Sequence, residues 1–208
     1  MIYLFSDKAY EGVVHLPLFE IVVDPTPFDV EGFDGIIFTS KNSVKALEQN
    51  GTVWKEKKAY AIGEGTASYI EQFGGNLVFT CKESYGDTFA KMLVPLLANQ
   101  KVFFPRAKEV SSSLFEILHV NHIDIEQRIV YETKCKHYPS SFAPAKEAKL
   151  IFTSPSTVHC FFENFAWDAS YIAIAIGEKT AAALPLDVKK SVSSAQSIEA
   201  CITLAKAL

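Results

Sequence analysis

Short apolar runs alternate along the chain with segments in which apolar residues recur at helical spacing. Several runs are apolar at every position, which is typical of parallel strands covered on both faces. The predicted strands are residues 1–5, 35–39, 59–62, 77–80, 101–104, 149–153, 171–176 and 188–192. The predicted helices are residues 43–49, 66–73, 88–97, 111–119, 156–162 and 180–184. This alternation predicts an α/β fold built on parallel sheets with right-handed crossovers.

Part of this pattern is written twice. Ala-Ile-Gly-Glu-Gly-Thr-Ala at residues 61–67 matches Ala-Ile-Gly-Glu-Lys-Thr-Ala at residues 175–181 in six of seven positions. Upstream, Ile-Ile-Phe-Thr-Ser at residues 36–40 matches Leu-Ile-Phe-Thr-Ser at residues 150–154. Both pairs have one offset, because 150 − 36 and 175 − 61 both give 114. A shared offset over two separate motifs indicates an internal duplication, and it predicts two similar units.

A weaker match extends the repeat toward the start of the chain. Residues 2–8 align with residues 102–108, and both continue into a longer, less uniformly apolar stretch. These two stretches, residues 13–23 and 125–134, are predicted to be connectors between two lobes. We therefore expect the chain to enter one lobe, cross to the other and return.

Composition and charge narrow the classes of function. Of the 208 residues, 49% are hydrophobic and 21% are charged, which suits an ordinary globular protein. The formal net charge of −4 disfavours a dedicated nucleic-acid binder, because such proteins usually carry a basic face. The start of the chain lacks the pattern of a signal peptide, and no apolar run approaches the ~18 residues of a membrane span. We expect a cytoplasmic protein that binds neither nucleic acid nor membrane.

Cysteine and histidine spacing does not indicate a metal site. The four cysteines are widely spaced and form no Cys-x-x-Cys pair: Cys81, Cys135, Cys160 and Cys201. Buried, reduced thiols are therefore expected. His119 and His122 have no cysteine or carboxylate pattern near them, and we interpret them as surface histidines.

Candidate chemistry lies at four strand-to-helix turns, in matched pairs. The turns are residues 40–43, 63–66, 154–157 and 177–180, and each carries hydroxyl residues. In open parallel sheets, ligands bind outside the carboxyl ends of the strands, where helix N-termini favour anions. Any one of these hydroxyls can equally serve only as a helix cap. The four matched turns together favour a two-sided site for an anionic ligand.

A nucleotide site is disfavoured. Gly63-x-Gly65-x-x-Ser68 is close to a dinucleotide fingerprint, but it lacks the final Gly or Ala. The second copy has Lys179 in place of Gly65, so the duplication did not keep the glycine pair. The sequence also contains no Walker loop, no Gly-x-Ser-x-Gly elbow and no Cys–His nucleophile pair.

Taken together, these motifs resemble the uroporphyrinogen-III synthase family. The resemblance covers essentially the whole chain in the right order, and its segments are residues 35–40, 61–67, 130–133, 151–156, 175–181 and 194–200. The family often has Ser-Pro-Arg after the first Phe-Thr-Ser strand, whereas here Ser40 is followed by Lys41 and Asn42. Lys41 is then the candidate replacement for that arginine.

The resemblance implies two flavodoxin- or Rossmann-like parallel-sheet lobes joined by a two-stranded β-ladder, with the substrate in the cleft between them. Lobe one then takes residues 1–15 and 136–208, lobe two takes residues 25–123, and the connecting strands are residues 13–24 and 124–135. The implied reaction closes linear hydroxymethylbilane to uroporphyrinogen III, with loss of water and inversion of ring D. It needs no cofactor or metal. The implied enzyme is a monomer that can receive its linear tetrapyrrole from the preceding pathway enzyme.

The family pattern also suggests roles for individual residues. Tyr131 is the candidate general acid, and a packed aromatic in a connector strand is the alternative. The residues expected to bind the substrate are Ser40, Lys41, Thr66, Ser154, Ser156, Thr180 and Arg106. For Arg106 and Lys108, solvated surface charge is an equally good interpretation.

A second function class stays open. A non-catalytic two-lobed module that closes around a small anionic ligand has the same gross layout. Formation of the type III isomer from hydroxymethylbilane distinguishes the enzyme from such a module, because only the type I product forms spontaneously.

Overall fold

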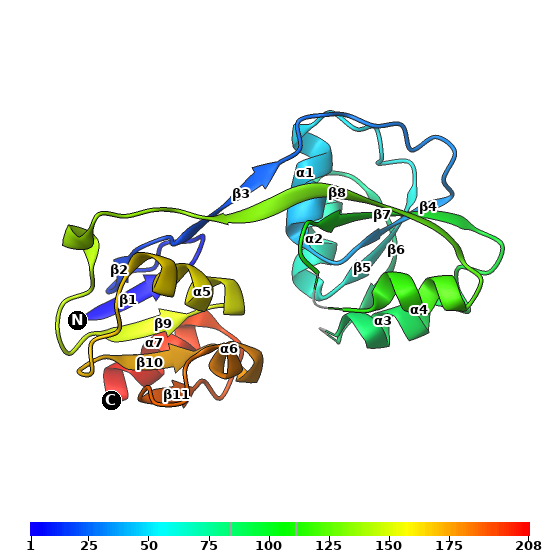
Figure 1. Ribbon diagram of the computed structural model, residues 1–208. Helices are drawn as coiled ribbons and strands as arrows, with labels where there is room; N and C mark the ends of the chain where they lie inside the picture. The colour runs from blue at the N-terminus through cyan, green and yellow to red at the C-terminus, as the bar shows by residue number, and fades with distance from the viewer. Residues whose placement is uncertain (84, 111) are drawn as a thin grey trace. The chain divides into compact units, whose positions relative to one another are not determined.

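The computed structural model describes residues 1–83, 85–110 and 112–208. The chain divides into two compact units (Figure 1). Unit one comprises Met1–Glu20 and Thr133–Leu208, and unit two comprises Ile21–Glu132. The first boundary falls within β3 (Phe19–Val23) and the second within β8 (Asp124–Cys135), so the chain changes unit inside these two strands.

Unit two is a three-layer α/β sandwich. Its sheet has the order β3-β8-β7-β4-β5-β6. Besides β3 and β8, it contains β4 (Gly35–Phe38), β5 (Lys58–Ile62), β6 (Asn76–Cys81) and β7 (Lys101–Ala107). The strands from β8 to β6 run parallel. One face packs on α1 (Lys41–Gln49) and α2 (Glu64–Gln72), and the other packs on α3 (Gly86–Leu93) and α4 (Leu114–Val120). Apolar side chains on both faces explain why these strands read as continuous hydrophobic runs.

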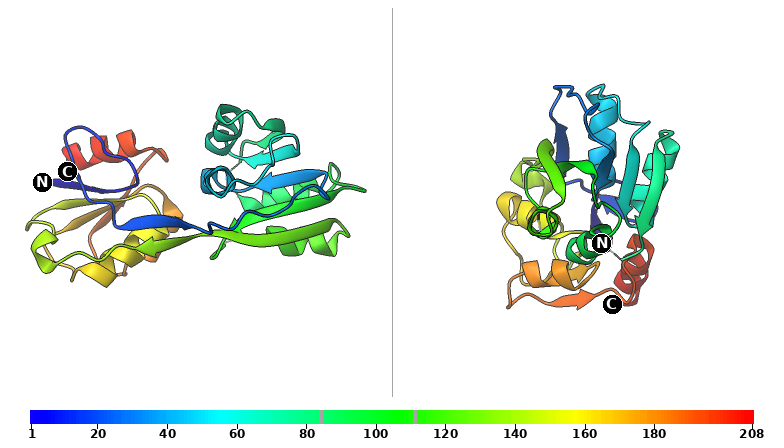
Figure 2. Two further views of the ribbon diagram at one scale, coloured as in Figure 1. Left: turned by 90° about the horizontal axis from the view of Figure 1, so that it is seen from above. Right: turned by 90° about the vertical axis from the view of Figure 1, so that its right-hand side faces the viewer.

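Unit one has the same layers. Its parallel sheet has the order β11-β10-β9-β1-β2, with β1 (Ile2–Phe5), β2 (Val14–His15), β9 (Lys149–Phe152), β10 (Ile172–Ala175) and β11 (Lys190–Val192). Helices α5 (Pro155–Asn164) and α6 (Glu178–Ala183) cover one face, and α7 (Ile198–Ala207) covers the other. Figure 2 shows α7 in red and α5 in yellow on opposite sides of this sheet. A short 3-10 helix, η1 (Ser140–Phe142), precedes β9.

The duplicated motifs occupy equivalent places in the two sheets. In unit two Ile36 pairs with Ala59, and in unit one Leu150 pairs with Ala173, so both partners keep the offset of 114. The order β7-β4-β5-β6 in unit two corresponds to β1-β9-β10-β11 in unit one. The α/β fold class, with two similar parallel sheets, is therefore confirmed.

Strands β3 and β8 are neighbours in the sheet. In unit two, the Asp24 backbone N donates to the Val130 carbonyl oxygen at 2.9 Å. In unit one, the Lys136 backbone N donates to the Leu18 carbonyl oxygen at 2.8 Å. Each unit therefore fixes its own part of the strand pair with its own hydrogen bonds.

The first predicted connector is not continuous. Val14 and His15 form β2, which pairs in parallel with β1, and only residues from Phe19 onward form β3. Pro17 lies between the two strands, and a proline has no backbone N–H to continue a ladder.

Helix α7 was not predicted as a helix. The predicted helix 111–119 begins at a residue outside the described part of the chain, and α4 spans Leu114–Val120.

The expectation of four reduced cysteines is wrong for one pair. Cys135 and Cys160 form a disulfide, with their Cα atoms 5.2 Å apart. Cys81 and Cys201 are free and buried. The pair is 25 residues apart in sequence, and only the packing of the β8 end against α5 brings the two sulfurs together. The spacing rule could not detect a contact of this kind.

None of the helices in the described ranges combines the length and the apolarity that a bilayer crossing requires.

Candidate functional site

A β-bulge places Tyr131 in the core of unit two. Along the β7–β8 pair, Arg106 pairs with Ile129 but Ala107 pairs with Tyr131, so Val130 is an extra residue. Successive side chains of a regular strand point to opposite faces, and a bulge breaks that alternation. Val130 and Tyr131 accordingly both pack in the cluster beneath α1 and α2. Tyr131 is 7% exposed.

The Tyr131 hydroxyl lies at the N-terminus of α1. The side chains of Ser40 and Asn42 hydrogen-bond to it. Burial raises the pKa of Tyr131 above its ordinary value, and these two hydrogen bonds act in the opposite direction without cancelling the effect of burial. The ordinary tyrosine pKa is about 10, so the phenol keeps its proton at neutral pH.

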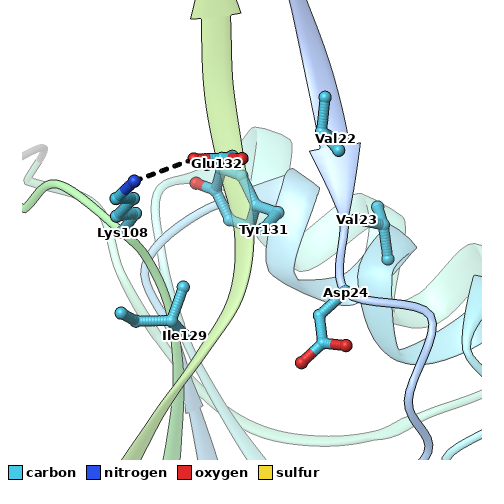
Figure 3. A pocket seen from close by; sticks show the side chains of 7 residues that line it. All are labelled: Val22, Val23, Asp24, Lys108, Ile129, Tyr131 and Glu132. Atoms are coloured by element: carbon cyan, nitrogen blue, oxygen red, sulfur yellow. Dashed lines mark hydrogen bonds and ion pairs between the residues drawn. The ribbon is translucent and has the colours of Figure 1, made fainter.

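Tyr131 also lines an open hollow of about 320 Å³ within unit two (Figure 3). The lining combines apolar and charged side chains: Val22, Val23, Asp24, Lys108, Ile129, Tyr131 and Glu132. Lys108 Nζ forms an ion pair with Glu132 Oε2 at 3.1 Å. A hydrogen bond from the backbone N of Thr26 is the largest cause that lowers the pKa of Asp24, which is therefore ionised at neutral pH. The hollow thus offers the Tyr131 phenol a solvent-accessible space with charges of both signs.

Ser40 caps α1 in extended geometry. Its Oγ accepts a hydrogen bond from the Asn42 backbone N at 3.1 Å. Lys41, the first residue of the helix, is half-buried. Two residues further on, Ser43 is fully buried, and its Oγ is without a hydrogen-bond partner among the described residues. Four consecutive polar residues therefore begin this helix, and two of them, Ser40 and Asn42, contact the Tyr131 hydroxyl.

The equivalent helix of unit one uses its hydroxyls differently. Ser154 Oγ accepts from the Thr157 backbone N at 3.2 Å, and Thr157 Oγ1 accepts from the Ser154 backbone N at 3.2 Å. Both hydroxyls are thus committed to a capping box. Ser40 and Ser43 stand at the same offset of 114, but Ser40 bonds to Tyr131 and Ser43 has no such partner among the described residues. The two copies therefore share the strand-to-helix turn, but only in unit two does the capping serine, Ser40, contact a tyrosine, Tyr131.

The remaining predicted hydroxyls follow the expected strands. Thr66 is the third residue of α2 and is buried, and Thr180 is the third residue of α6 and is also buried. Ser156 is exposed at the second position of α5. Because β9 and β10 are parallel neighbours, Ser154, Ser156 and Thr180 lie at one edge of the unit-one sheet.

The Arg106 side chain donates its hydrogen bonds to residues of its own unit, unit two. Its Nε donates to Gln127 Oε1 at 2.8 Å. Its Nη1 donates to the carbonyl oxygens of Ala107 and Lys108, at 2.8 and 2.9 Å. These bonds fix the turn that follows β7, and through it the backbone position of Lys108 beside the hollow. Lys108 in turn donates its backbone N–H to the Tyr131 carbonyl oxygen at 2.9 Å, so this turn links Arg106 to Tyr131.

The retained glycines of the repeat serve different purposes. Gly63 precedes α2 with φ +75° and ψ 146°, a conformation that residues with a side chain rarely adopt. Gly177 precedes α6 in ordinary extended backbone, and a Cβ there would lie 3.2 Å from Gln196 Nε2.

Sequence reasoning did not identify Asn42 as a site residue. The available signal was its place at the second position of a helix whose cap, Ser40, was already a candidate. The bulge that turns Tyr131 toward that helix has no signature in the sequence, so the contact itself was not predictable.

Comparisons with known proteins agree on one family. A family model described as uroporphyrinogen-III synthase HemD matches residues 8–203. The crystal structure of uroporphyrinogen-III synthetase from Helicobacter pylori is similar to this chain, with 31% identity and a TM-score of 0.87 over 99% of this chain and 98% of that one. A mutant uroporphyrinogen III synthase from the extremely thermophilic bacterium Thermus thermophilus has a TM-score of 0.60 at 14% identity, over 99% of this chain and 97% of that one, and shows a similar fold. A comparison with curated proteins gave no match.

Proposed function

This chain belongs to the uroporphyrinogen-III synthase family, the cyclising lyases of tetrapyrrole biosynthesis, and we propose that its Tyr131 donates the proton that leaves with the substrate hydroxyl. The enzyme converts linear hydroxymethylbilane to uroporphyrinogen III, with loss of water and inversion of ring D. The observation that supports a role for Tyr131 is the contrast between the two duplicated helix starts. Only in unit two does the capping serine bond to a buried phenol.

In the proposed step, the Tyr131 O–H bond breaks as the carbon–oxygen bond of the hydroxymethyl group breaks, and the hydroxyl leaves as water. The substrate becomes an azafulvene cation, and Tyr131 becomes a phenolate. Hydrogen bonds from Ser40 and Asn42 stabilise that phenolate, because donors to a charged oxygen favour its charged form. The proton lost from the ring carbon after closure returns to Tyr131.

The protein's further task is to hold the bilane in the conformation that closes to the type III isomer. The substrate carries acetate and propionate carboxylates, and helix N-termini with hydroxyl residues suit such groups. We assign this binding to Ser40, Lys41 and Thr66 in unit two. In unit one the candidates are Ser154, Ser156 and Thr180. Positioning and charge stabilisation of this kind can supply a large share of the rate without a protein nucleophile.

The direct test is incubation of the purified chain with hydroxymethylbilane, followed by oxidation and separation of the porphyrin isomers. A predominantly type III product is expected. A product that is only type I would mean that the chain does not direct closure, and it would favour the alternative of a non-catalytic module for a small anionic ligand.

Two finer properties are proposed with the function. We infer that the chain acts as a monomer, because each sheet has both faces covered by helices of its own unit. It can then receive its substrate directly from the preceding pathway enzyme. We also propose a cytoplasmic location, where the Cys135–Cys160 disulfide would be kept reduced. Scattering from the purified chain and cell fractionation test the two properties separately.

A further inference from the structure

A cluster of metal-ligating side chains lies in unit one, and the proposed reaction does not use it. Cys135 ends β8, and His159 and Glu163 are one turn apart on α5. The Cys135 sulfur, one His159 ring nitrogen and one Glu163 carboxylate oxygen all lie within 4.8 Å of one another. His159 Nε2 is 2.9 Å from Glu163 Oε1. Three residues from two separate elements therefore present their donor atoms to one point.

The three donors form a set that suits a borderline-soft divalent ion. A thiolate, an imidazole and a carboxylate are all common zinc ligands, and a site with three protein ligands leaves a fourth position for water. Residues four apart lie on the same face of a helix, which is how His159 and Glu163 come to share the site. The side chains of His159 and Glu163 are 72% and 39% exposed, so an ion can enter from solvent.

One observation stands against a permanent metal site. Cys135 is joined to Cys160 in a disulfide. Metals bind the deprotonated thiol, and a sulfur held in a disulfide cannot supply it. The site is therefore complete only when that bond is reduced.

We propose that Cys135, His159 and Glu163 form a thiol-gated site for a divalent transition metal such as Zn²⁺, which is closed by the Cys135–Cys160 disulfide and opened by its reduction. A dithiol supplies the two electrons and becomes a disulfide, while Cys135 and Cys160 each gain one proton. The metal ion then displaces the proton of the Cys135 thiol, which is released to solvent. Cys160 is 2% exposed and remains in the core.

The two states make alternative cross-links between the same two elements. The disulfide ties the end of β8 to α5 through Cys160, and the metal ties it to α5 through His159 and Glu163. The cross-link lies near residue 133, where the chain re-enters unit one. Either link would fix the end of β8 against α5, one under oxidising and one under reducing conditions.

The test is a titration of the full-length protein with Co²⁺ and then Zn²⁺, in oxidised form and after reduction by a phosphine, which brings no competing thiol. The reduced chain is expected to bind one Co²⁺ with a thiolate-to-metal charge-transfer band, which Zn²⁺ abolishes. The oxidised chain is expected to bind about 100-fold more weakly, because its thiolate ligand is missing. Equal affinity in the two forms, or no binding by the reduced chain, would overturn the proposal.

Cysteine variants distinguish the role of Cys160, which closes the site through the disulfide, from the role of Cys135, which binds the metal. Cys160→Ala cannot form the disulfide but keeps the Cys135 thiol, so it should show the band without reductant, and Cys160→Ser provides a second version if the alanine variant folds poorly. Cys135→Ala should show no band in either condition. Cys201→Ala removes a buried thiol elsewhere in unit one and should behave like the parent chain. A band that persists in Cys135→Ala would place the metal elsewhere and overturn the assignment.

Side-chain variants on α5 test the other two ligands. His159→Ala and Glu163→Gln should each weaken Co²⁺ binding by the reduced chain by about tenfold or more. Unchanged affinity in both variants would mean that the thiols bind the metal without α5, which contradicts the proposed site.

Discussion

The side chain of Ser40 hydrogen-bonds to the buried hydroxyl of Tyr131 and, at the same time, accepts a hydrogen bond from the Asn42 backbone N at 3.1 Å. One residue therefore both starts α1 and contacts the phenol. The local order of the helix and the chemistry of the candidate site are coupled through a single hydroxyl.

Ser40→Ala should consequently affect both stability and turnover. Loss of a serine cap costs about 1 kcal/mol of unfolding free energy. The variant also loses one of the two hydrogen bonds to Tyr131, so kcat should fall. Ser197→Ala is the matched control, because Ser197 Oγ caps α7 by accepting from the Ala200 backbone N at 3.2 Å and has no part in the candidate site. A similar stability loss in both variants with a fall in kcat only for Ser40→Ala supports the site, and equal kcat effects would contradict it.

Tyr131→Phe tests the proposed proton donor. A general acid typically contributes about 10²–10⁴-fold, and we expect the low end or below, because the electron-rich pyrrole already assists departure of the hydroxyl. Both kcat and kcat/KM should fall together, since the interaction strengthens in the transition state. Tyr138→Phe is the control, because its hydroxyl donates to the Pro17 carbonyl oxygen at 2.8 Å in unit one. Unchanged kinetics in a folded Tyr131→Phe variant would show that Tyr131 only packs.

Alkaline pH provides an independent test of the environment of Tyr131. Burial raises its pKa, so the folded state favours the protonated phenol. The resulting stability is fully present below the unfolded pKa of about 10 and is lost as the pH rises through the folded pKa. Tyr131→Phe should lose less stability than the parent chain between pH 9 and about pH 12. The measurement is denaturant unfolding at several pH values, and identical pH dependence in both proteins would contradict the expectation.

The sequence predicted the fold better than the site, and the reason is physical. Strands such as residues 35–38 are apolar on both faces, and the repeat at a fixed offset transfers the pairing of Ile36 with Ala59 to Leu150 with Ala173. The local hydrophobic pattern therefore predicts which segments are strands. The duplication predicts which residues of neighbouring strands pair. The Tyr131–Ser40 contact depends on a bulge at Val130, which arises from the pairing of β7 with β8 and leaves no mark in composition.

The Cys135–Cys160 disulfide was missed for a related reason. The two cysteines belong to a strand end and a helix, and their approach depends on how α5 packs against the unit-one sheet. Motif rules detect ligands that are close in sequence. They do not detect pairs that tertiary packing brings together.

The buried threonines test substrate binding separately from the chemistry. Thr66→Val or Thr180→Val removes one donor among many at the helix starts, so neither variant should abolish turnover. The effect should fall mainly on KM, because a contact made equally in the ground and transition states changes binding without changing kcat. Thr203→Val is the control, since its Oγ1 donates to the Glu199 carbonyl oxygen on an exposed helix face. A large fall in kcat for Thr66→Val would instead give that residue a catalytic role.

The paired glycines give the last prediction, on stability. Gly63→Ala places a side chain at φ +75° and ψ 146°, a region that is nearly restricted to glycine, so it should lower the unfolding free energy by about 1–3 kcal/mol. Gly177 is in extended backbone, and its new methyl would meet only the exposed, flexible Gln196 side chain at 3.2 Å. Gly177→Ala should therefore cost about 0.5 kcal/mol or less. Urea unfolding of both variants, followed by circular dichroism, compares them directly. Equal losses would mean that the glycine of the repeat has the same role in both units, contrary to the two backbone conformations.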